Sequence, residues 1–241
     1  MESIGPEGGY LDLRVSPDER QLAATIGGRR GTQIWLTDLA RGATTPFTLD
    51  GFSQSPIWSP DGARIVYRSL RTSMAEFYLK SAAGGGSEQP VFLADAQIAV
   101  RAANPVATDW SPDGRYLLYC TLTSAFGYDL WLLPVTGDRT PVAYLSAPSD
   151  QLHGAFSPNG RFVAYSSNES GRFEVYVQTF PLSDRRWQIS VSGGYEPRWR
   201  RDGRDRRVRR SFVPTRLPFP GRRPGAPGSC PSLSAPCSAS P

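Results

Sequence analysis

Residues 108–119 read TDWSPDGRYLLY, and the pentapeptide WSPDG near their start decides the fold. The same pentapeptide stands at 58–62, and altered copies read VSPDE at 15–19, FSPNG at 156–160 and WRRDG at 199–203. The acidic or amide residue of each copy serves as a marker, and successive markers are 43, 52, 46 and 43 residues apart. The markers are Asp18, Asp61, Asp113, Asn159 and Asp202. A repeat of roughly 45 residues has the length of four short strands with their turns, so repeated four-stranded units are predicted.

Each residue of the SPDG sequence has a role in a tight turn between the first two strands of a unit. Proline fixes φ at about −65°, aspartate suits the next position, and glycine adopts the left-handed conformation that closes the hairpin. The first copy has Glu19 in place of glycine. If the backbone conformation is kept, this replacement costs about 1 kcal/mol. Asn159 in the fourth copy is a mild change, because asparagine also suits turns.

Apolar residues keep a fixed distance from these markers. The position three residues before the marker carries Val15, Trp58, Trp110, Phe156 and Trp199. The position four residues after it carries Leu22, Ile65, Leu117 and Val163. An aromatic residue flanked by apolar neighbours follows 17 or 18 residues after the marker, at Trp35, Tyr78, Trp131 and Tyr176. Such a continuous apolar triplet predicts a strand that is buried on both faces.

Each unit is predicted to end with a short outer strand, at 46–49, 90–93, 141–145 and 187–190. A sheet with two apolar faces cannot bury both alone, so the units should pack face to face around an axis. The predicted fold is therefore an all-β propeller of about four recognisable four-stranded blades plus the first strand of a fifth, which we interpret as part of a larger propeller. The expected organisation is a lead-in at 1–9, a propeller at 10–202 with blades at about 10–50, 54–94, 106–146 and 152–190 and a partial blade at 195–202, and a tail at 203–241.

These motifs resemble the TolB-type, WD-repeat-like propellers, whose hallmark is WSPDG followed by an aliphatic-x-Tyr strand; the resemblance runs from about residue 10 to 202. QIWLTDLARG (33–42), ESGRFEVYVQTFP (169–181) and WQISVSGGYEPRWRRDG (187–203) are similar to the C-terminal propeller of bacterial, notably acidobacterial, eukaryotic-type serine/threonine protein kinases. In that family a kinase domain precedes the propeller, but the HRD and DFG motifs of a kinase are absent from this sequence. The resemblance therefore implies a sensor or interaction part.

The repeat pattern stops after residue 202. Arg206 occupies the position that is aliphatic in the other units, and residues 203–241 hold eight arginines against one acid, Asp205. That stretch carries +7 and the whole chain +5, which leaves −2 for residues 1–202. The composition predicts a disordered Arg/Pro/Ser-rich tail. Two origins stay open, a natural basic tail and the product of a shifted reading frame; the chain's 26 arginines against one lysine favour the second.

An unfinished fifth blade has a structural consequence. We expect one terminal blade to leave an apolar face bare and the strand at 195–199 to lack a partner.

Residues for catalysis or metal binding are scarce in this sequence. The chain has one histidine, His153, and three cysteines without metal-ligand spacing, so we predict no catalytic triad, no metal site and no cofactor. We interpret His153 as an ordinary loop or channel-facing residue, and the repeated aspartates as turn residues rather than a calcium or acid–base set. GGGS at 84–87 lacks the lysine of a phosphate-binding loop, and we interpret the glycosylation sequon at Asn168 as a chance match.

The overall composition, with 39% hydrophobic and 20% charged residues, is typical of a globular chain. No apolar run reaches the length of about 18 residues that a membrane-spanning helix needs, so we expect no membrane span. The first residues have neither a basic start nor an apolar stretch, so we also expect no secretory signal.

The predicted function is a non-catalytic scaffold in a kinase-like or Tol-like bacterial system. Its loops at 94–106, 121–128 and 146–153 and its central channel would bind an unknown protein, peptide or cell-envelope component. Nucleic acid is not the expected partner, because the folded part is slightly acidic. Two alternatives stay open: a fragment of an enzyme, either a kinase or a propeller-gated hydrolase or lactonase, and a non-functional pseudogene product. The sequence assigns no compartment, although the kinases it resembles often place this part outside the cytoplasm or in the periplasm.

Overall fold

The computed structural model describes residues 8–29, 31–72, 74–92, 103–123, 127–200 and 212–213. Regular structure in these residues consists of β-strands, and four antiparallel four-stranded sheets contain most of them. No helix in this part of the chain is long and apolar enough to cross a membrane. The structure thus confirms the predicted fold, an all-β propeller with four four-stranded blades and an additional strand.

Each blade is a meander in which neighbouring strands follow one another in sequence. The first blade comprises β1 (Gly9–Val15), β2 (Gln21–Gly28), β3 (Gly31–Asp38) and β4 (Thr44–Pro46). The second comprises β5 (Ser53–Trp58), β6 (Arg64–Ser69), β7 (Glu76–Ser81) and β8 (Gln89–Phe92). The third comprises β9 (Ala103–Trp110), β10 (Tyr116–Thr123), β11 (Gly127–Pro134) and β12 (Val142–Leu145). The fourth comprises β13 (Gln151–Phe156), β14 (Phe162–Ser167), β15 (Glu174–Thr179) and β16 (Arg186–Gln188).

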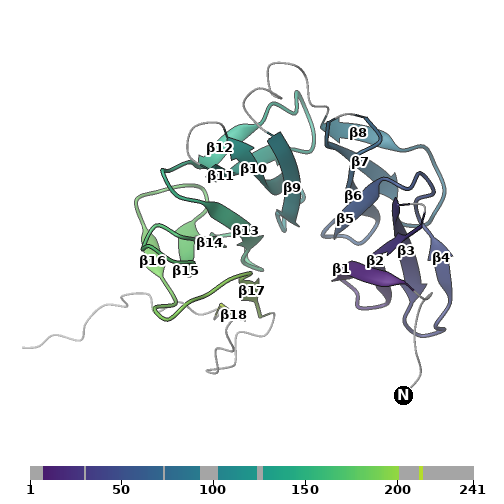
Figure 1. Ribbon diagram of the computed structural model, residues 1–241, viewed down its shortest axis with the longest axis horizontal. Coiled ribbons are helices and arrows are strands. Elements are labelled where there is room, and N and C mark those ends of the chain that lie inside the picture. Colours follow the sequence, from purple (N-terminus) through teal and green to yellow (C-terminus); the bar gives the residue numbers. More distant parts are fainter. Residues whose placement is uncertain are drawn as a thin grey trace, which may run out of the picture.

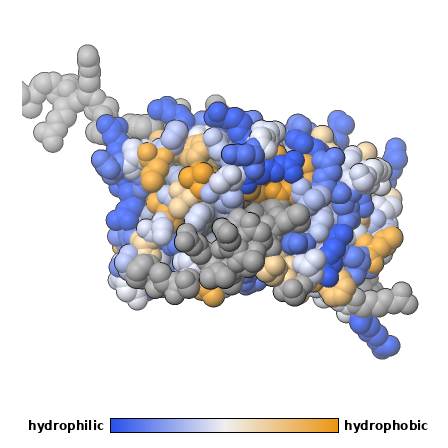
Figure 2. All heavy atoms as spheres, turned by 90° about the horizontal axis from the view of Figure 1, so that it is seen from above, coloured by the Kyte–Doolittle hydropathy of each residue, from blue (hydrophilic) through white to orange (hydrophobic). Residues whose placement is uncertain are grey.

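The four blades stand radially around a common centre (Figure 1). The first strand of each blade, β1, β5, β9 or β13, is innermost, and the fourth strand lies at the rim. The ring is open between β1 and the short strands β17 (Arg198–Trp199) and β18 (Phe212–Val213). On the face seen in Figure 2, apolar side chains form separate patches among polar ones.

The apolar core is divided among the interfaces between neighbouring blades, which we call joints. At the first joint Ile34 of β3 belongs to one buried cluster with Trp58, Ile65 and Tyr67 of the second blade. Val66, between Ile65 and Tyr67, belongs instead to the cluster shared by the second and third blades. Because alternate side chains of a strand point to opposite faces, a central blade buries both of its faces. Each fully buried large apolar side chain contributes about 1.5–3 kcal/mol, so the joints hold the ring together.

The SPDG turns have the same hydrogen bonds in all four copies. In the second copy, the Ser59 hydroxyl donates to Asp61 Oδ1 at 2.5 Å and accepts from the Arg64 backbone N–H at 2.9 Å. The residue that closes the turn has a left-handed backbone, with φ of 61° at Glu19, 70° at Gly62, 76° at Gly114 and 66° at Gly160. In the first copy Glu19 thus has the backbone conformation that glycine has in the other three copies. The predicted cost of about 1 kcal/mol for a non-glycine residue in this conformation therefore applies to Glu19.

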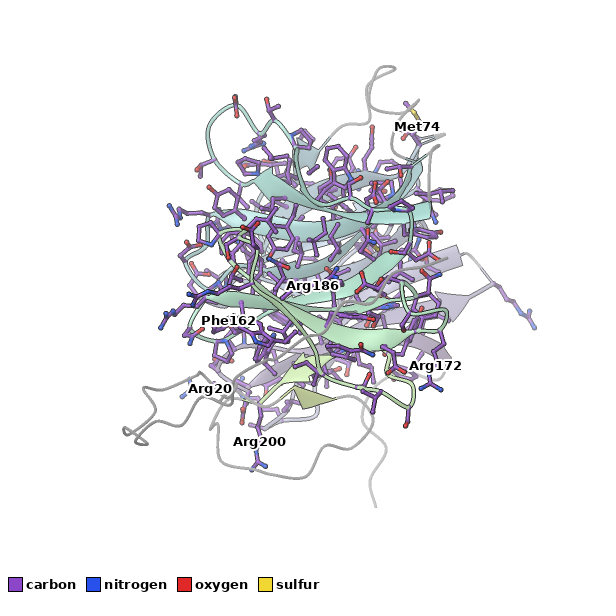
Figure 3. The ribbon with its side chains drawn as sticks, turned by 90° about the vertical axis from the view of Figure 1, so that its left-hand side faces the viewer. Arg20, Met74, Phe162, Arg172, Arg186 and Arg200 are labelled. Carbon is purple, nitrogen blue, oxygen red and sulfur yellow. The ribbon has the colours of Figure 1, made fainter. Side chains whose placement is uncertain are left out.

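These turns all lie at one end of the propeller. Figure 3 shows Arg20 and Phe162, which follow two of the turns, toward one side, and Met74 and Arg172, between second and third strands, toward the other. We call these the turn end and the opposite end.

The outer strands of the first and fourth blades differ from the prediction. They end at Pro46 and Gln188 instead of 49 and 190. At the first, the Ile34 N–H donates to the Thr48 hydroxyl at 2.9 Å, and Phe47 turns into the joint with 4% of its surface exposed. At the fourth, the Val175 N–H donates to the Ser190 hydroxyl at 2.8 Å. A side-chain acceptor therefore replaces the backbone partner, and the chain leaves the sheet early. The strands predicted at 90–93 and 141–145 are β8 and β12, each offset by one residue at one or both ends.

The start of a fifth unit is present as β17, and its expected lack of a partner was wrong. It pairs in parallel with β18, Arg198 opposite Phe212 and Trp199 opposite Val213. Trp199 also packs against the cluster of Phe162, Ala164, Val175 and Val177, which covers the outer face of the fourth blade. The last marker, Asp202, and the predicted disordered tail, except Phe212 and Val213, lie outside the described residues.

The first blade has the expected bare face. Leu13 and Val15 of β1 are 50% and 53% exposed, and Tyr10 is 42% exposed. Leu13 lies opposite Ala24, which lies opposite Trp35, so these residues share the face turned away from the second blade.

Candidate functional site

The aromatic residues before the turns lie at equivalent places, at the inner end of each joint. Trp58, Trp110 and Phe156 are the last residues of β5, β9 and β13 and are 7%, 4% and 5% exposed. The Trp58 indole N–H donates to the Arg14 carbonyl of the preceding blade at 2.9 Å. Trp199 makes the equivalent contact after the fourth blade: its indole N–H donates to the Ala155 carbonyl of that blade at 2.8 Å. These contacts fasten one blade to the next.

Two joints use other groups. At the joint between the second and third blades, the Trp110 indole N–H donates within its own blade, to the Gly114 carbonyl of the turn that follows, at 3.1 Å. Phe156 has no side-chain donor. At that joint Asp109 of the third blade accepts from the backbone N–H of Phe156 at 2.6 Å and from the backbone N–H of Trp110 at 2.8 Å.

The aromatic residues of the third strands lie away from the axis, on the blade faces. Tyr78 stacks on Tyr67 with ring centroids 6.2 Å apart, and Tyr176 stacks on Tyr165 at 5.8 Å. Trp131 packs against the cluster between the second and third blades. These three side chains support the joints rather than a ligand site, whereas Trp35 lies on the face of the first blade that is turned away from the second.

At the turn end the four blades line an open axial cavity of about 310 Å³. Its apolar lining repeats the turn sequence, with one proline from each blade and the aromatic residues that precede three of the turns. The lining residues include Pro17, Pro60, Pro112, Pro158, Trp58, Trp110 and Phe156. Arg14 and Asp109 supply its charged groups. An apolar, rigid lining with few charged groups is typical of a binding site.

Burial raises the pKa of Asp109 to about 6. Two influences lower this pKa, but they do not offset burial. They are the hydrogen bonds from the backbones of Phe156 and Trp110 and the positive charges of Arg14 and Arg198. The cavity wall therefore carries a carboxyl group that titrates near neutral pH.

By contrast, the turn carboxylates have lowered pKa values. At Asp18 and Asp61 the hydroxyl of the turn serine is the main cause, followed by a backbone N–H. At Asp113 burial opposes the shift, but hydrogen bonds from Ser111 and Arg115 outweigh it. Asn159 accepts the same bonds from the Ser157 hydroxyl at 2.8 Å and the Arg161 N–H at 3.1 Å. Each marker is thus satisfied within its own turn.

The first strand of a blade, or the segment just before it, carries a second repeated feature that the sequence reasoning missed. Ser55, His153 and Glu196 all stand three residues before the turn aromatic, and have left-handed φ values of 54°, 55° and 51°. Asn104 on β9 has φ of 60°. The ladder is irregular between Gln54 and Ile57, and between Leu152 and Ala155. Non-glycine residues in this conformation are uncommon, and bulges redirect side chains near functional sites.

The acceptor for these left-handed residues also recurs, seven residues after the marker of the preceding blade. The Ser55 N–H donates to the Thr25 hydroxyl and the Glu196 N–H to the Ser166 hydroxyl, both at 3.1 Å. The same position holds Arg68 in the second blade and Cys120 in the third. Burial raises the pKa of Cys120 to about 11, and a hydrogen bond from the His153 backbone partly offsets the effect. A polar residue after the aliphatic-x-Tyr strand was the signal that could have revealed this set.

His153 lies within β13, and so is not a loop residue. Its ring contacts Tyr195, with centroids 4.4 Å apart, and its Nε2 is 4.0 Å from Glu196 Oε1. Burial lowers its pKa, so the imidazole is neutral at pH 7. Its Nδ1 is buried without a hydrogen-bond partner. Within the described ranges no three His, Cys, Asp or Glu side chains gather as metal ligands.

The remaining sequence candidates are ordinary structural elements. The Asn168 side chain accepts from the Asp150 N–H and donates to Asp150 Oδ2, both at 2.9 Å, so its amide is engaged. Gly84 and Gly86 have φ of 81° and 92° in the turn before β8.

Comparisons with known proteins show the same architecture. TolB from Acinetobacter baumannii superposes with a TM-score of 0.65 at 16% identity, over 79% of this chain and 45% of that one. An acylaminoacyl peptidase from Pyrococcus horikoshii superposes with a TM-score of 0.51 at 14% identity, over 76% of this chain and 32% of that one. These identities support a shared propeller fold. The predicted TolB-type fold is thereby confirmed, while the resemblance to kinase propellers stays a prediction.

One sequence relative suggests a second context. A probable dipeptidyl-peptidase 5 from Arthroderma benhamiae is 38% identical over 128 residues, which are 52% of this chain and 15% of that protein. The chain therefore spans a small part of this relative and less than half of the A. baumannii TolB. No protein-family model matches the chain.

Proposed function

We propose that this chain is a non-catalytic propeller scaffold that binds a protein or peptide through its axial cavity, on behalf of a larger bacterial assembly of the kinase or Tol type. The observation that supports it most is the cavity lining: four blades each contribute the same turn proline, and only Arg14 and Asp109 add charge. Repeated residues supply a rigid apolar surface, and unrepeated ones supply specificity. The loops predicted at 94–106 and 121–128 lie largely outside the described residues, so their part in recognition stays a prediction.

Binding of the purified chain to an array of synthetic peptides tests this proposal. Arg14→Ala removes a charged group from the cavity, while the Arg14 carbonyl that accepts from Trp58 is kept. Arg20→Ala is the matched control, because Arg20 is an exposed arginine at the same end but does not line the cavity. We expect bound peptides to lose at least about tenfold in affinity in Arg14→Ala, equivalent to about 1.4 kcal/mol, and little in Arg20→Ala. Equal affinity in both variants and the parent chain would contradict the proposal.

A second candidate function is the propeller part of a peptidase. The match to the probable dipeptidyl-peptidase 5 and the shared fold with the acylaminoacyl peptidase favour it. In such an enzyme the hydrolase domain would be a separate part, and the propeller would control access. Incubation of the chain with aminoacyl and dipeptidyl p-nitroanilides distinguishes the proposals: the scaffold predicts no release of nitroaniline, whereas turnover by this chain would overturn it.

A further inference from the structure

Arg68 is a half-buried arginine that has no acidic partner among the residues that the structure describes. It lies on β6, at the joint with the third blade. Burial lowers its pKa, and the described groups that act electrostatically on this pKa are Cys120 and Tyr128. Burial raises the pKa of the Cys120 thiol to about 11, so Cys120 supplies no negative charge at pH 7. A charge removed from water is normally compensated by an opposite charge.

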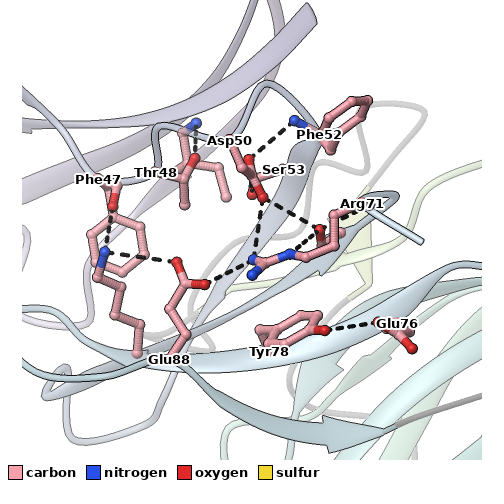
Figure 4. Close-up of polar contacts among 12 residues, drawn as sticks. Phe47, Thr48, Asp50, Phe52, Ser53, Arg71, Glu76, Tyr78 and Glu88 are labelled. Atoms are coloured by element: carbon pink, nitrogen blue, oxygen red, sulfur yellow. Dashed lines mark hydrogen bonds and ion pairs between the residues drawn. The ribbon is translucent and has the colours of Figure 1, made fainter.

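Two other arginines on the blades, Arg71 and Arg186, follow that rule. Arg71 lies 3.2 Å from Asp50 of the first blade and 2.8 Å from Glu88 of its own, and its guanidinium stands over the Tyr78 ring (Figure 4). Arg186 pairs with Glu169 at 2.8 Å. An arginine needed only to hold two blades together would be expected to have such a partner.

The hydrogen bonds of Arg68 are also incomplete. Its Nη2 donates to the side-chain oxygen of Asn104 on β9, and its Nε–H is buried without a partner. Nε and Nη2 form the edge of a guanidinium that a carboxylate binds with two parallel hydrogen bonds. Asn104 offers one neutral oxygen to that edge, from an exposed residue in a left-handed bulge.

We propose that the Arg68–Asn104 edge is a binding site for a carboxylate group of the partner peptide, which replaces the Asn104 amide oxygen and accepts from both Nε and Nη2. The inference rests on the proposed function, since a peptide supplies the carboxylate. The planar, two-oxygen carboxylate fits the flat edge, and it brings the negative charge that Arg68 lacks. His153 Nδ1 is another buried atom without a hydrogen-bond partner. It lies on β13, the innermost strand of the fourth blade.

Matched pairs of peptides test the site. One pair is acetyl-tetra-alanine with a free or an amidated C-terminus, and the other is an amidated acetyl-peptide with one glutamate or one glutamine. Calorimetry should show at least tenfold tighter binding of the acid in one pair. The first pair identifies an α-carboxylate and the second a side-chain carboxylate. Inorganic phosphate should bind more weakly than the preferred acid.

Three variants locate the effect. Arg68→Gln should lose the preference for the acid, and Arg64→Gln, at the exposed first residue of the same strand, should keep it. Asn104→Asp places a carboxylate of the chain itself beside Arg68; it should raise the melting temperature and lower affinity for the acid at least tenfold. The melting temperature of Arg68→Gln should stay near that of the parent chain, because the variant also removes an uncompensated charge.

Equal binding of acid and amide peptides, an acid preference retained in Arg68→Gln, or phosphate binding without any acid preference would overturn the site. A chain that binds peptides without distinguishing acid from amide would contradict this inference and leave the proposed function standing. A chain that binds no peptide at all would contradict the proposed function itself.

Discussion

Replacement of Asp109 by asparagine should change how the stability of the protein depends on pH. The carboxyl group has its pKa raised from 3.8 to about 6 by burial. A raised pKa means that ionisation is less favourable in the folded state, so the charged form costs stability as the pH rises through 6. A difference of about two units corresponds to about 3 kcal/mol at full ionisation, and to about 2–3 kcal/mol between pH 4 and pH 8.

The sign of the effect separates it from the loss of a hydrogen bond. The asparagine of the variant would offer one oxygen where Asp109 accepts from both Phe156 and Trp110, which lowers stability by about 1 kcal/mol at every pH. Ionisation of Asp109 lowers the stability of the parent chain as the pH rises, whereas the asparagine of the variant does not ionise. The free energy of unfolding of Asp109→Asn minus that of the parent chain should therefore rise by about 2–3 kcal/mol from pH 4 to pH 8.

Urea unfolding of both proteins at several pH values measures this difference directly. Asp113→Asn is the control, because the pKa of Asp113 is lowered and its contribution changes in the opposite direction. If the free energies of unfolding of Asp109→Asn and of the parent chain differ by a constant amount from pH 4 to pH 8, the assignment of a titrating carboxyl group to the cavity wall is refuted.

Three further substitutions test the scaffold. Glu19→Gly should raise the free energy of unfolding by about 0.5–1 kcal/mol, because Glu19 has φ of 61°; a loss of stability in a urea titration would contradict this. Trp58→Phe should cost about 1–2 kcal/mol, since it leaves the partly buried Arg14 carbonyl without its donor; an unchanged midpoint would show that the first joint does not depend on this bond. Leu13→Ser, on the bare face where Leu13 is 50% exposed, should change stability by less than about 0.5 kcal/mol and reduce light scattering on concentration; a large loss of stability would mean that the face is covered.

The blade framework was predictable because it depends on local chemistry that repeats. The turn at 58–62 needs only serine, proline, aspartate and glycine close in sequence, and its hydrogen bonds all lie within six residues. The apolar residues around it follow from the alternation of a strand. The outer strands were placed less accurately, because Thr48 and Ser190 compete with the backbone for the same donors.

The charged groups near the axis could not be predicted in the same way. Asp109 has a raised pKa because the fold buries its carboxyl group in the cavity wall, next to Phe156, which lies 47 positions later in the sequence. Arg68 reads as an ordinary arginine on a strand, and its missing partner becomes visible only when the third blade is placed beside it. His153 was interpreted as a loop or channel-facing residue; the structure places it within β13, where a bulge interrupts the strand. Such properties arise from contacts between units, whereas the repeat reports contacts within them.

Proton NMR of the two joint tryptophans is the most direct test of the stacked blades. The indole N–H protons of Trp58 and Trp199 should each show nuclear Overhauser effects to the inner strand of the preceding blade, at Arg14 and at Ala155, residues that lie 44 positions earlier in the sequence. Both protons should also exchange slowly with water. Effects confined to each tryptophan's own hairpin, with fast exchange, would show that the repeated units do not stack around a common axis.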